Sequence, residues 1–246
     1  MNIKFQEGIK LNMKQTFKQK MEQKCAELTN VQHEQFEEYK NLLLEWNEKI
    51  NLTAITDEDD IILKHFIDSM TILKHIENDS TIVDVGTGAG FPGLPVKIAN
   101  PNIKVTLVDS LNKRILFLED VIAKLNLKEI KTVHSRAEEF GQNKKYREKF
   151  DIATSRAVAN LSVLAEYLLP LVKVGGKCIC MKGSEIQEEL KNSKKSIEIL
   201  GGQIQKIEEF TLPEGEIKRN IIIIKKVKQT PHKYPRKPGV PSKNPL

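Results

Sequence analysis

The spacing of apolar residues divides the chain into two parts. In the first part, apolar side chains return every three or four residues, which is the period of an amphipathic helix. This pattern predicts helical structure over residues 13–50, with Thr29 or Asn30 as an N-cap within it, and over residues 59–76. We therefore expect an all-helical N-terminal subdomain over residues 1–78.

The second part alternates short β-branched runs with helical segments. Strands are predicted at residues 81–85, 104–109, 130–134, 150–155, 176–181, 203–212 and 219–227. Helices are predicted at residues 95–99, 112–125, around Glu138, 160–169 and 185–200, with a polar loop at 213–215. This alternation is typical of the α/β class. We expect a doubly wound, mostly parallel seven-stranded sheet over residues 79–228, followed by a basic, Pro-rich tail over residues 229–246.

Charge is unevenly distributed along the 246 residues. The chain has 39 Lys and Arg against 33 Asp and Glu, a formal net charge of +6. Residues 225–246 alone carry six Lys and one Arg and no acidic residue, so the remainder of the chain is nearly neutral. The five prolines of this segment predict a stiff, extended tail. Its charge favours an anionic partner.

Several classes of protein are excluded by the sequence. No apolar run approaches the roughly 20 residues of a membrane helix, and residues 1–13 have no apolar core of a secretory signal. The cysteines, Cys25, Cys178 and Cys180, fit neither a disulfide framework nor a zinc or redox pair, and the five histidines are scattered. We expect a cytoplasmic protein with no membrane span and no metal site, and its cysteines as buried or free thiols.

The first predicted strand ends in a glycine-rich loop with the sequence Asp84-Val85-Gly86-Thr87-Gly88-Ala89-Gly90. Glycine allows backbone to approach a ligand closely and to adopt a positive φ. Asp109 ends the second predicted strand, where its carboxylate can accept the hydroxyl groups of a ribose. The two features together predict an adenosine-binding site at the carboxyl ends of the strands.

The details of this loop distinguish among adenosine cofactors. The dinucleotide fingerprint needs a glycine where this chain has Phe91, and the Gly-Lys-Ser/Thr of a phosphate-binding loop is absent here. A carboxylate at Asp84 would repel a pyrophosphate but suits a ligand that carries an ammonium and a sulfonium group. The expected cofactor is therefore S-adenosyl-L-methionine.

Motifs along most of the chain carry a family resemblance. They are Trp46-Asn47, Asn51-Leu52-Thr53, Lys64-His65-Phe66 with Asp68-Ser69, Asp84 to Gly93, Asp109-Ser110-Leu111 with Lys113-Arg114, Ser135-Arg136-Ala137-Glu138, Ser155-Arg156-Ala157 and Lys233 to Gly239. With these motifs, residues 31–246 resemble a bacterial family of enzymes that methylate guanine N7 in small-subunit ribosomal RNA. This family is the small-subunit ribosomal RNA methyltransferase G family, also called glucose-inhibited division protein B. The resemblance implies a class I, Rossmann-like methyltransferase that uses S-adenosylmethionine to methylate N7 of a guanine in the decoding-region loop of 16S ribosomal RNA.

The loop and the resemblance together give a set of candidate site residues. The cofactor-binding candidates are Gly86, Gly88, Gly90, Phe91, Asp109, Ala137, Glu138 and Arg156. The resemblance implies that Ala137 and Glu138 meet the adenine end of the cofactor. It also implies that Arg156, the candidate catalytic residue, lies near the methionine end and the target base. We expect His65 on a helix surface or as a cap, and Tyr39 and Trp46 in the core.

The residues at the end of the fourth predicted strand bear on the kind of methyl transfer. Residues 154–158 read Thr-Ser-Arg-Ala-Val, unlike the Asn/Asp-Pro-Pro-Tyr/Phe pattern of enzymes that methylate exocyclic amines. Guanine N7 has a lone pair and no proton, so its in-line attack on a sulfonium methyl needs no general base. Two alternatives stay open: a methyltransferase that acts on another RNA or a ribosomal protein, and a non-enzymatic ribosome-assembly or RNA-binding factor that retains the cofactor pocket.

The basic residues suggest how RNA is held. Lys113, Arg114 and Arg136 follow predicted strands near the expected cleft, and with the tail they can neutralise phosphates of 16S ribosomal RNA or of the small ribosomal subunit. We expect a chain shortened after Ile224 to keep its cofactor affinity while its RNA binding weakens.

Overall fold

The N-terminal region is helical, as the apolar spacing predicts, but it is divided into several pieces. The computed structural model describes residues 15–24, 28–213 and 216–246. The helices of this region are α1 (Phe17–Lys24), α2 (Asn30–Ile50), α3 (Glu58–Asp60), the π-helix η1 (Ile61–Ile67), α4 (Asp68–Met70) and the 3₁₀-helix η2 (Leu73–His75). Thr29 caps α2 through a capping box with Gln32, so the N-cap prediction is confirmed. Cys25 lies outside the described residues.

The sheet has the expected seven strands. They are β1 (Thr81–Val85), β2 (Lys104–Asp109), β3 (Ile130–His134), β4 (Phe150–Arg156), β5 (Val172–Lys182), β6 (Gly202–Thr211) and β7 (Lys218–Lys226). Their order is β3-β2-β1-β4-β5-β7-β6. β7 pairs antiparallel with both β5 and β6, and the other neighbouring strands are parallel. The prediction of a doubly wound, mostly parallel sheet is confirmed. Of the loop predicted at 213–215, Glu214 and Gly215 lie outside the described residues.

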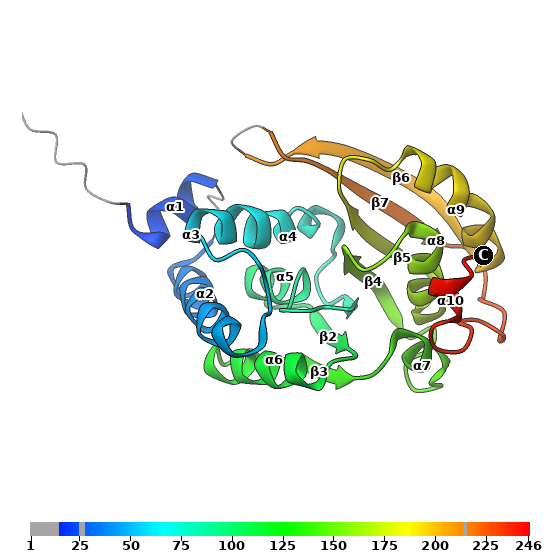
Figure 1. The fold of residues 1–246 in the computed structure, drawn as a ribbon, viewed down its shortest axis with the longest axis horizontal. Coiled ribbons are helices and arrows are strands. Elements are labelled where there is room, and N and C mark those ends of the chain that lie inside the picture. Colours follow the sequence, from blue (N-terminus) through cyan, green and yellow to red (C-terminus); the bar gives the residue numbers. More distant parts are fainter. Residues whose placement is uncertain (1–14, 25–27, 214–215) are drawn as a thin grey trace, which may run out of the picture.

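Helices cover both faces of the sheet (Figure 1). They are α5 (Gly93–Ala99), α6 (Asn112–Lys124), α7 (Ala137–Gln142), α8 (Leu161–Leu168), the 3₁₀-helix η3 (Leu169–Leu171), α9 (Gln187–Ile199) and, in the tail, α10 (Val240–Lys243). Strand β7 shows why both faces need cover, because Ile221 and Ile223 enter one apolar cluster while Ile222 and Ile224 enter the other. All four side chains are buried.

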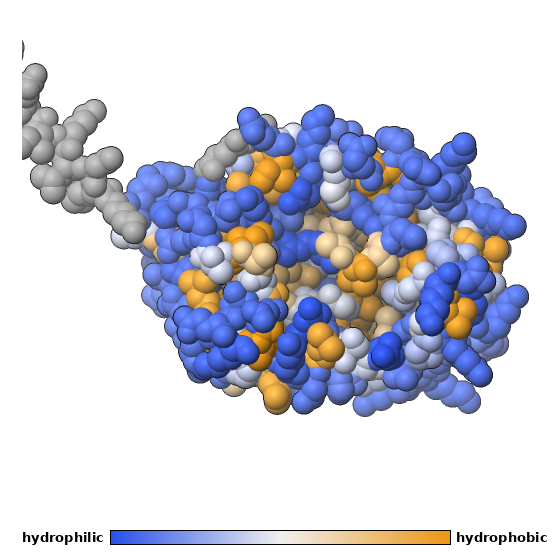
Figure 2. All heavy atoms as spheres, in the orientation of Figure 1, coloured by the Kyte–Doolittle hydropathy of each residue, from blue (hydrophilic) through white to orange (hydrophobic). Residues whose placement is uncertain are grey.

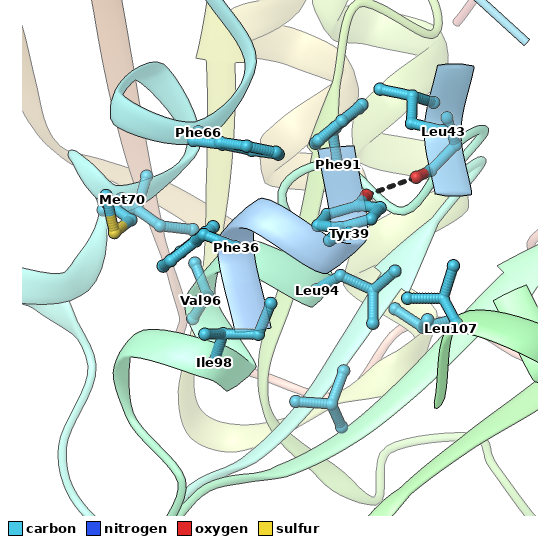
Figure 3. Packing of buried hydrophobic residues seen from close by; sticks show 14 of the residues in the cluster. Phe36, Tyr39, Leu43, Phe66, Met70, Phe91, Leu94, Val96, Ile98 and Leu107 are labelled. Atoms are coloured by element: carbon cyan, nitrogen blue, oxygen red, sulfur yellow. Dashed lines mark hydrogen bonds between the residues drawn. The ribbon is translucent and has the colours of Figure 1, made fainter. Parts of the chain in front are cut away.

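The N-terminal helices share a core with one face of the sheet. Tyr39 of α2 forms a triangle of rings with Phe66 of η1 and Phe91, which follows the glycine-rich loop; its ring centroid is 5.3 Å from that of Phe66 and 5.6 Å from that of Phe91 (Figure 3). Its hydroxyl donates to the Ala89 carbonyl at 2.5 Å. Trp46 packs against the same cluster. Tyr39 and Trp46 are therefore packing residues, as expected, and they join the helices to the loop.

The C-terminal tail folds back onto the domain. After β7 the chain passes α7 and α8, and α10 lies beside α8 (Figure 1). Tyr234 is buried, and Lys226 is fully buried with its ammonium 2.9 Å from Glu148. The expectation of an extended tail is wrong, because the tail contains turns at residues 232–233 and 238–239 and the short helix α10. Lys226 of β7 and Arg236 of the tail form ion pairs with Glu148 and Glu166, so only part of the positive charge of residues 225–246 is available to a partner.

Candidate active site

A cleft of about 610 Å³ opens at the carboxyl ends of β1 and β4, where the strand order reverses. Ligands of open α/β sheets bind at this point, and the volume suits a cofactor-sized molecule. In Figure 2 the cleft is the hollow near the middle of the face, with apolar and weakly polar side chains inside a hydrophilic rim. The N-terminal helices, the sheet and the tail all contribute lining residues.

The glycine-rich loop forms one wall of this cleft. Gly86, Gly88 and Gly90 have φ values of 68°, 62° and 98°, which favour glycine. Gly86 and Gly88 line the cleft, and a Cβ on Gly88 would have no atom within 4 Å. A Cβ on Gly90 would instead meet Leu94 and the Tyr39 hydroxyl. Gly90 does not line the cleft, so its backbone conformation serves the turn and the packing beneath it.

The Asp84 side chain stabilises the loop on the side away from the cleft. Its Oδ2 accepts from the Thr87 hydroxyl at 2.7 Å and from the Gly93 N–H at 2.9 Å. The side chain is fully buried and does not line the cleft, and burial raises the pKa of its carboxyl to about 6. The sequence interpretation of Asp84 as a carboxylate that faces the ligand therefore differs from its position in the structure.

Asp109 reaches the cleft from the end of β2, as predicted. One carboxylate oxygen accepts from the Gly88 N–H at 2.9 Å and from Arg114 at 3.2 Å, and the other accepts from the Leu111 N–H at 2.9 Å. A carboxylate offers about four acceptor positions, so these three bonds leave capacity for a ribose hydroxyl. The bonds also fix the orientation of the side chain.

Residues of α7, α8 and the tail form another part of the cleft wall. Ala137 and Glu138 line it, and Glu138 accepts from the Gly239 N–H at 2.8 Å. Tyr167 of α8 shares a hydrogen bond of 2.9 Å with Ser242. Sequence reasoning missed Tyr167, Gly239 and Ser242, because no local pattern indicates that these positions meet.

Arg156 lies at the end of β4, where its guanidinium lines the cleft. The group stands 4.8 Å from the centre of the Phe91 ring. It donates to Asp68 at 3.1 Å and to the Lys64 carbonyl at 3.0 Å. Asp68 is buried and also accepts from Arg219 at 3.2 Å. These contacts hold the guanidinium of Arg156 in one orientation beside Phe91.

His65 is part of the same cluster, and its expected position on a helix surface is wrong. The buried ring stacks on Phe91 with centroids 4.4 Å apart. Arginine can only donate, so His65 Nδ1 accepts from Arg156 Nη2 at 3.2 Å, and Nε2–H donates to the Thr53 hydroxyl at 2.9 Å. Burial and the charge of Arg156 lower the pKa of His65 to about 4, so the ring is neutral near pH 7.

The described residues contain neither a thiol at the cleft nor a metal site. Cys178 and Cys180 lie buried in β5 and do not line the cleft. Burial raises the pKa of both thiols, that of Cys180 to about 12. Across residues 15–24, 28–213 and 216–246, no cluster of three or more His, Cys, Asp or Glu side chains has a metal-binding arrangement, and no helix has the length and apolarity of a membrane span.

The order of the strands and the cleft at the strand reversal are those of the class I methyltransferase fold. The fold is similar to a SAM-dependent methyltransferase of Aquifex aeolicus, with a TM-score of 0.51 and 18% identity over 68% of this chain and 93% of that chain. It is also similar to the ribosomal protein L11 methylase of Lactobacillus delbrueckii, with a TM-score of 0.52 and 16% identity over 67% of this chain and 79% of that chain.

Sequence comparison narrows the class to one family. The model of the family GidB, rRNA small subunit methyltransferase G, matches residues 32–222. The ribosomal RNA small subunit methyltransferase G of Acetivibrio thermocellus is 60% identical over 89% of this chain and 90% of that protein. The protein of the same name from Alkaliphilus metalliredigens is 51% identical over 90% of this chain and 95% of that protein. The chain belongs to this family, which confirms the resemblance seen in its motifs.

Proposed function

We propose that the protein transfers a methyl group from S-adenosylmethionine to N7 of a guanine in the decoding-region loop of 16S ribosomal RNA, in the cytoplasm. One observation carries the proposal: the family model extends over residues 32–222, and this stretch includes the glycine-rich loop, Asp109 and Arg156, which meet at one cleft. The names of these relatives give small-subunit ribosomal RNA as their substrate.

The residues that line the cleft fit the cofactor. The open space above Gly88 admits a ligand against the backbone, and Asp109 retains an acceptor position for a ribose hydroxyl. Ala137 and Glu138 are proposed to bind the adenine end, and Gly86 and Phe91 the part nearer Arg156. When bound, S-adenosylmethionine supplies an electrophilic methyl group on its sulfonium sulfur.

The groups around the cleft suit a nucleophile that needs no deprotonation. His65 is neutral, and its Nδ1 is occupied by Arg156. The two described cysteines are buried within the sheet. The N7 lone pair of guanine attacks without losing a proton, so the protein has to position the base in line with the methyl group and keep water out. This requirement is the physical reason for preferring N7 over pyrimidine C5, which needs a thiol.

Arg156 is the proposed catalytic residue. Phe91 supports one face of its guanidinium, while Asp68 and the Lys64 carbonyl bind one edge. Its charge at the cleft is fixed in position, which is what a group needs if it is to contact the target base without reorganising during the reaction.

The proposed RNA-binding surface surrounds the mouth of the cleft. Arg136, the N-cap residue of α7, is exposed there, and Lys233 and Lys237 are exposed in the tail. Arg114 is partly neutralised by Asp109. We propose that the exposed cations contact phosphates, so rRNA binding should weaken steeply as salt concentration rises.

The decisive test offers tritiated S-adenosylmethionine and the protein to naked 16S rRNA, isolated small subunits and intact ribosomes in parallel. The labelled RNA is digested, and its nucleosides are identified by mass spectrometry. We expect label in 7-methylguanosine, located in the decoding-region loop. Label in a ribosomal protein or in another nucleoside would overturn the proposal. The variant Gly88→Val serves as an inactive control, because its side chain would enter the cleft.

A further inference from the structure

The C-terminal tail follows residues 32–222, which the family model matches, yet it lines the cleft through Gly239 and Ser242. We propose that residues 238–243 form a cofactor-binding strap, which completes the end of the cleft assigned to the adenosine part of S-adenosylmethionine. The inference rests on the proposed function, because it concerns how the same cleft holds its cofactor. It replaces the expectation that the tail is dispensable for cofactor binding.

The strap contacts two residues of the cleft wall directly. The Gly239 N–H donates to the Glu138 carboxylate at 2.8 Å, and the hydroxyls of Ser242 and Tyr167 are 2.9 Å apart. Glu138 is buried, so hydrogen-bond donors of the protein have to replace the water molecules that its carboxylate would bind in solution. The strap therefore fixes the orientation of Glu138 and forms part of the cleft wall itself.

The position of the strap is set by a latch immediately before it. Arg236 donates to both oxygens of Glu166, with its Nη2 at 2.7 Å and its Nε at 2.9 Å. The Arg236 backbone N–H adds a third donor at 2.8 Å. Only 1% of the Glu166 side chain is exposed, and α8 carries both Glu166 and Tyr167. The paired charges fasten the tail to the helix that contributes Tyr167 to the cleft.

Further bonds follow the backbone of the tail. Arg147 donates to the carbonyls of Tyr234 at 2.7 Å and Thr230 at 2.8 Å. Gln142, at the end of α7, donates to the Pro235 carbonyl at 2.7 Å. These donors satisfy backbone oxygens that proline-rich chain cannot pair within a helix or sheet. The tail is thus held by Arg147 and by residues of α7 and α8, next to the end of the cleft that is proposed to bind the adenosine.

A variant that ends at Lys237 separates the strap from its latch. It retains Lys226, Tyr234 and Arg236 with their partners but lacks Gly239 and Ser242. Calorimetry should show that the Kd for S-adenosylmethionine rises at least tenfold. Urea unfolding without cofactor reports whether the shortened chain keeps its fold.

A pair of point variants tests the strap without removing any chain. Ser242 and Lys243 are both exposed neighbours on α10, but Ser242 lines the cleft and Lys243 does not. Ser242→Phe should raise the Kd for S-adenosylmethionine at least tenfold by narrowing the cleft, while Lys243→Phe should leave this Kd unchanged. Because both side chains are exposed, each variant is expected to fold.

The outcomes distinguish this inference from the proposed function. Unchanged cofactor affinity in Ser242→Phe, or in a folded chain that ends at Lys237, would overturn the strap while the methyltransferase proposal stands. If the full chain binds no S-adenosylmethionine, the proposed function fails and the strap fails with it. A tail that serves RNA alone would raise the KM for rRNA on truncation and leave the cofactor Kd unchanged, which also overturns the strap.

Discussion

The open space above Gly88 allows a sharp test of where the cofactor lies. Gly88 has a φ of 62°, and a Cβ there would meet no atom within 4 Å. Gly175, in β5, provides a matched control, because its φ is 91° and its Cβ position is equally open, but it does not line the cleft. An alanine at either site should therefore cost similar backbone strain, about 1–2 kcal/mol.

The two variants should differ only when cofactor is present. At a concentration 100 times Kd, a ligand stabilises the folded chain by about 2.7 kcal/mol. Overpacking by one methyl group costs about 1–3 kcal/mol, or roughly a 30-fold rise in Kd at the middle of this range. Gly88→Ala should then gain only about 1 kcal/mol at the same cofactor concentration. Gly175→Ala should keep the gain of the unmodified chain.

Urea unfolding with and without S-adenosylmethionine measures these gains. The comparison uses the same cofactor concentration for the unmodified chain, Gly88→Ala and Gly175→Ala. A full gain in Gly88→Ala would refute the position of the cofactor above this turn. A gain lost equally in both variants would show that backbone strain, rather than contact with the ligand, weakens binding.

Three further predictions concern the latch and the Arg156 cluster. Arg236→Met leaves the buried Glu166 carboxylate without its cation and should lower the free energy of unfolding in urea by about 3–5 kcal/mol. The exposed control Lys237→Met should stay within about 0.5 kcal/mol, and equal losses would contradict the latch. Folding lowers the pKa of His65 from 6.5 to about 4, so the unfolded chain binds the proton more readily than the folded chain. The stability that the neutral ring contributes is therefore lost as the pH falls from about 6.5 to about 4. The difference in unfolding free energy between the unmodified chain and His65→Gln should therefore shrink by about 3 kcal/mol from pH 7 to pH 4, and a constant difference would count against the buried neutral ring. Arg156→Ala should lower initial methyl-transfer rates by about 100-fold or more while it lowers the urea midpoint modestly, and an unchanged rate would remove its catalytic role.

Local periodicity was sufficient to predict the sheet. Each strand has a β-branched or apolar run that either alternates or is buried on both faces, as in residues 221–224 of β7. Prediction failed at strand ends that depend on pairing partners. β5 begins at Val172 rather than at residue 176, because Val172 already pairs with Phe150 of β4. The pairing of the two strands is interrupted near Gly175 and Gly176 and resumes at Lys177. Gly175 and Gly176 interrupt the pattern of apolar residues that predicts a strand, although the strand itself continues through them.

The candidate site was predictable where it follows from the topology. Gly88, Asp109 and Arg156 end or follow parallel strands, so any doubly wound arrangement brings them to one edge of the sheet. His65 was not predictable, because the π-helix η1 adds a residue to the turn and changes which side chains face the core. Gly90 was predicted to bind the cofactor from its motif alone, but in the structure its Cα faces Leu94 and the Tyr39 hydroxyl instead of the cleft.

The tail shows a different limit of sequence reasoning. Its prolines and lysines are typical of an extended, solvated segment. Its actual path depends on Arg147 and Glu166, which precede it by more than 60 residues and have no pattern that marks them as partners of a tail. Side-chain bonds to distant backbone carbonyls carry no periodic signal.

The aromatic contact of Tyr39 and Phe66 with Phe91 constrains how this chain can recombine with its relatives. In a chimera with a crossover near residue 78, the N-terminal helices would come from a relative, and their aromatic residues would pack on Phe91 and Leu94 of this chain instead of on the relative's own loop. The mismatch would arise although the sequence pattern changes from helical to alternating strand and helix close to this point. The same crossover would separate Asp68 from Arg156 and Arg219. The unit that can be exchanged intact therefore includes the N-terminal helices, the loop after β1, the end of β4 and the start of β7. A viable chimera has to preserve contacts between residues that are far apart in the sequence.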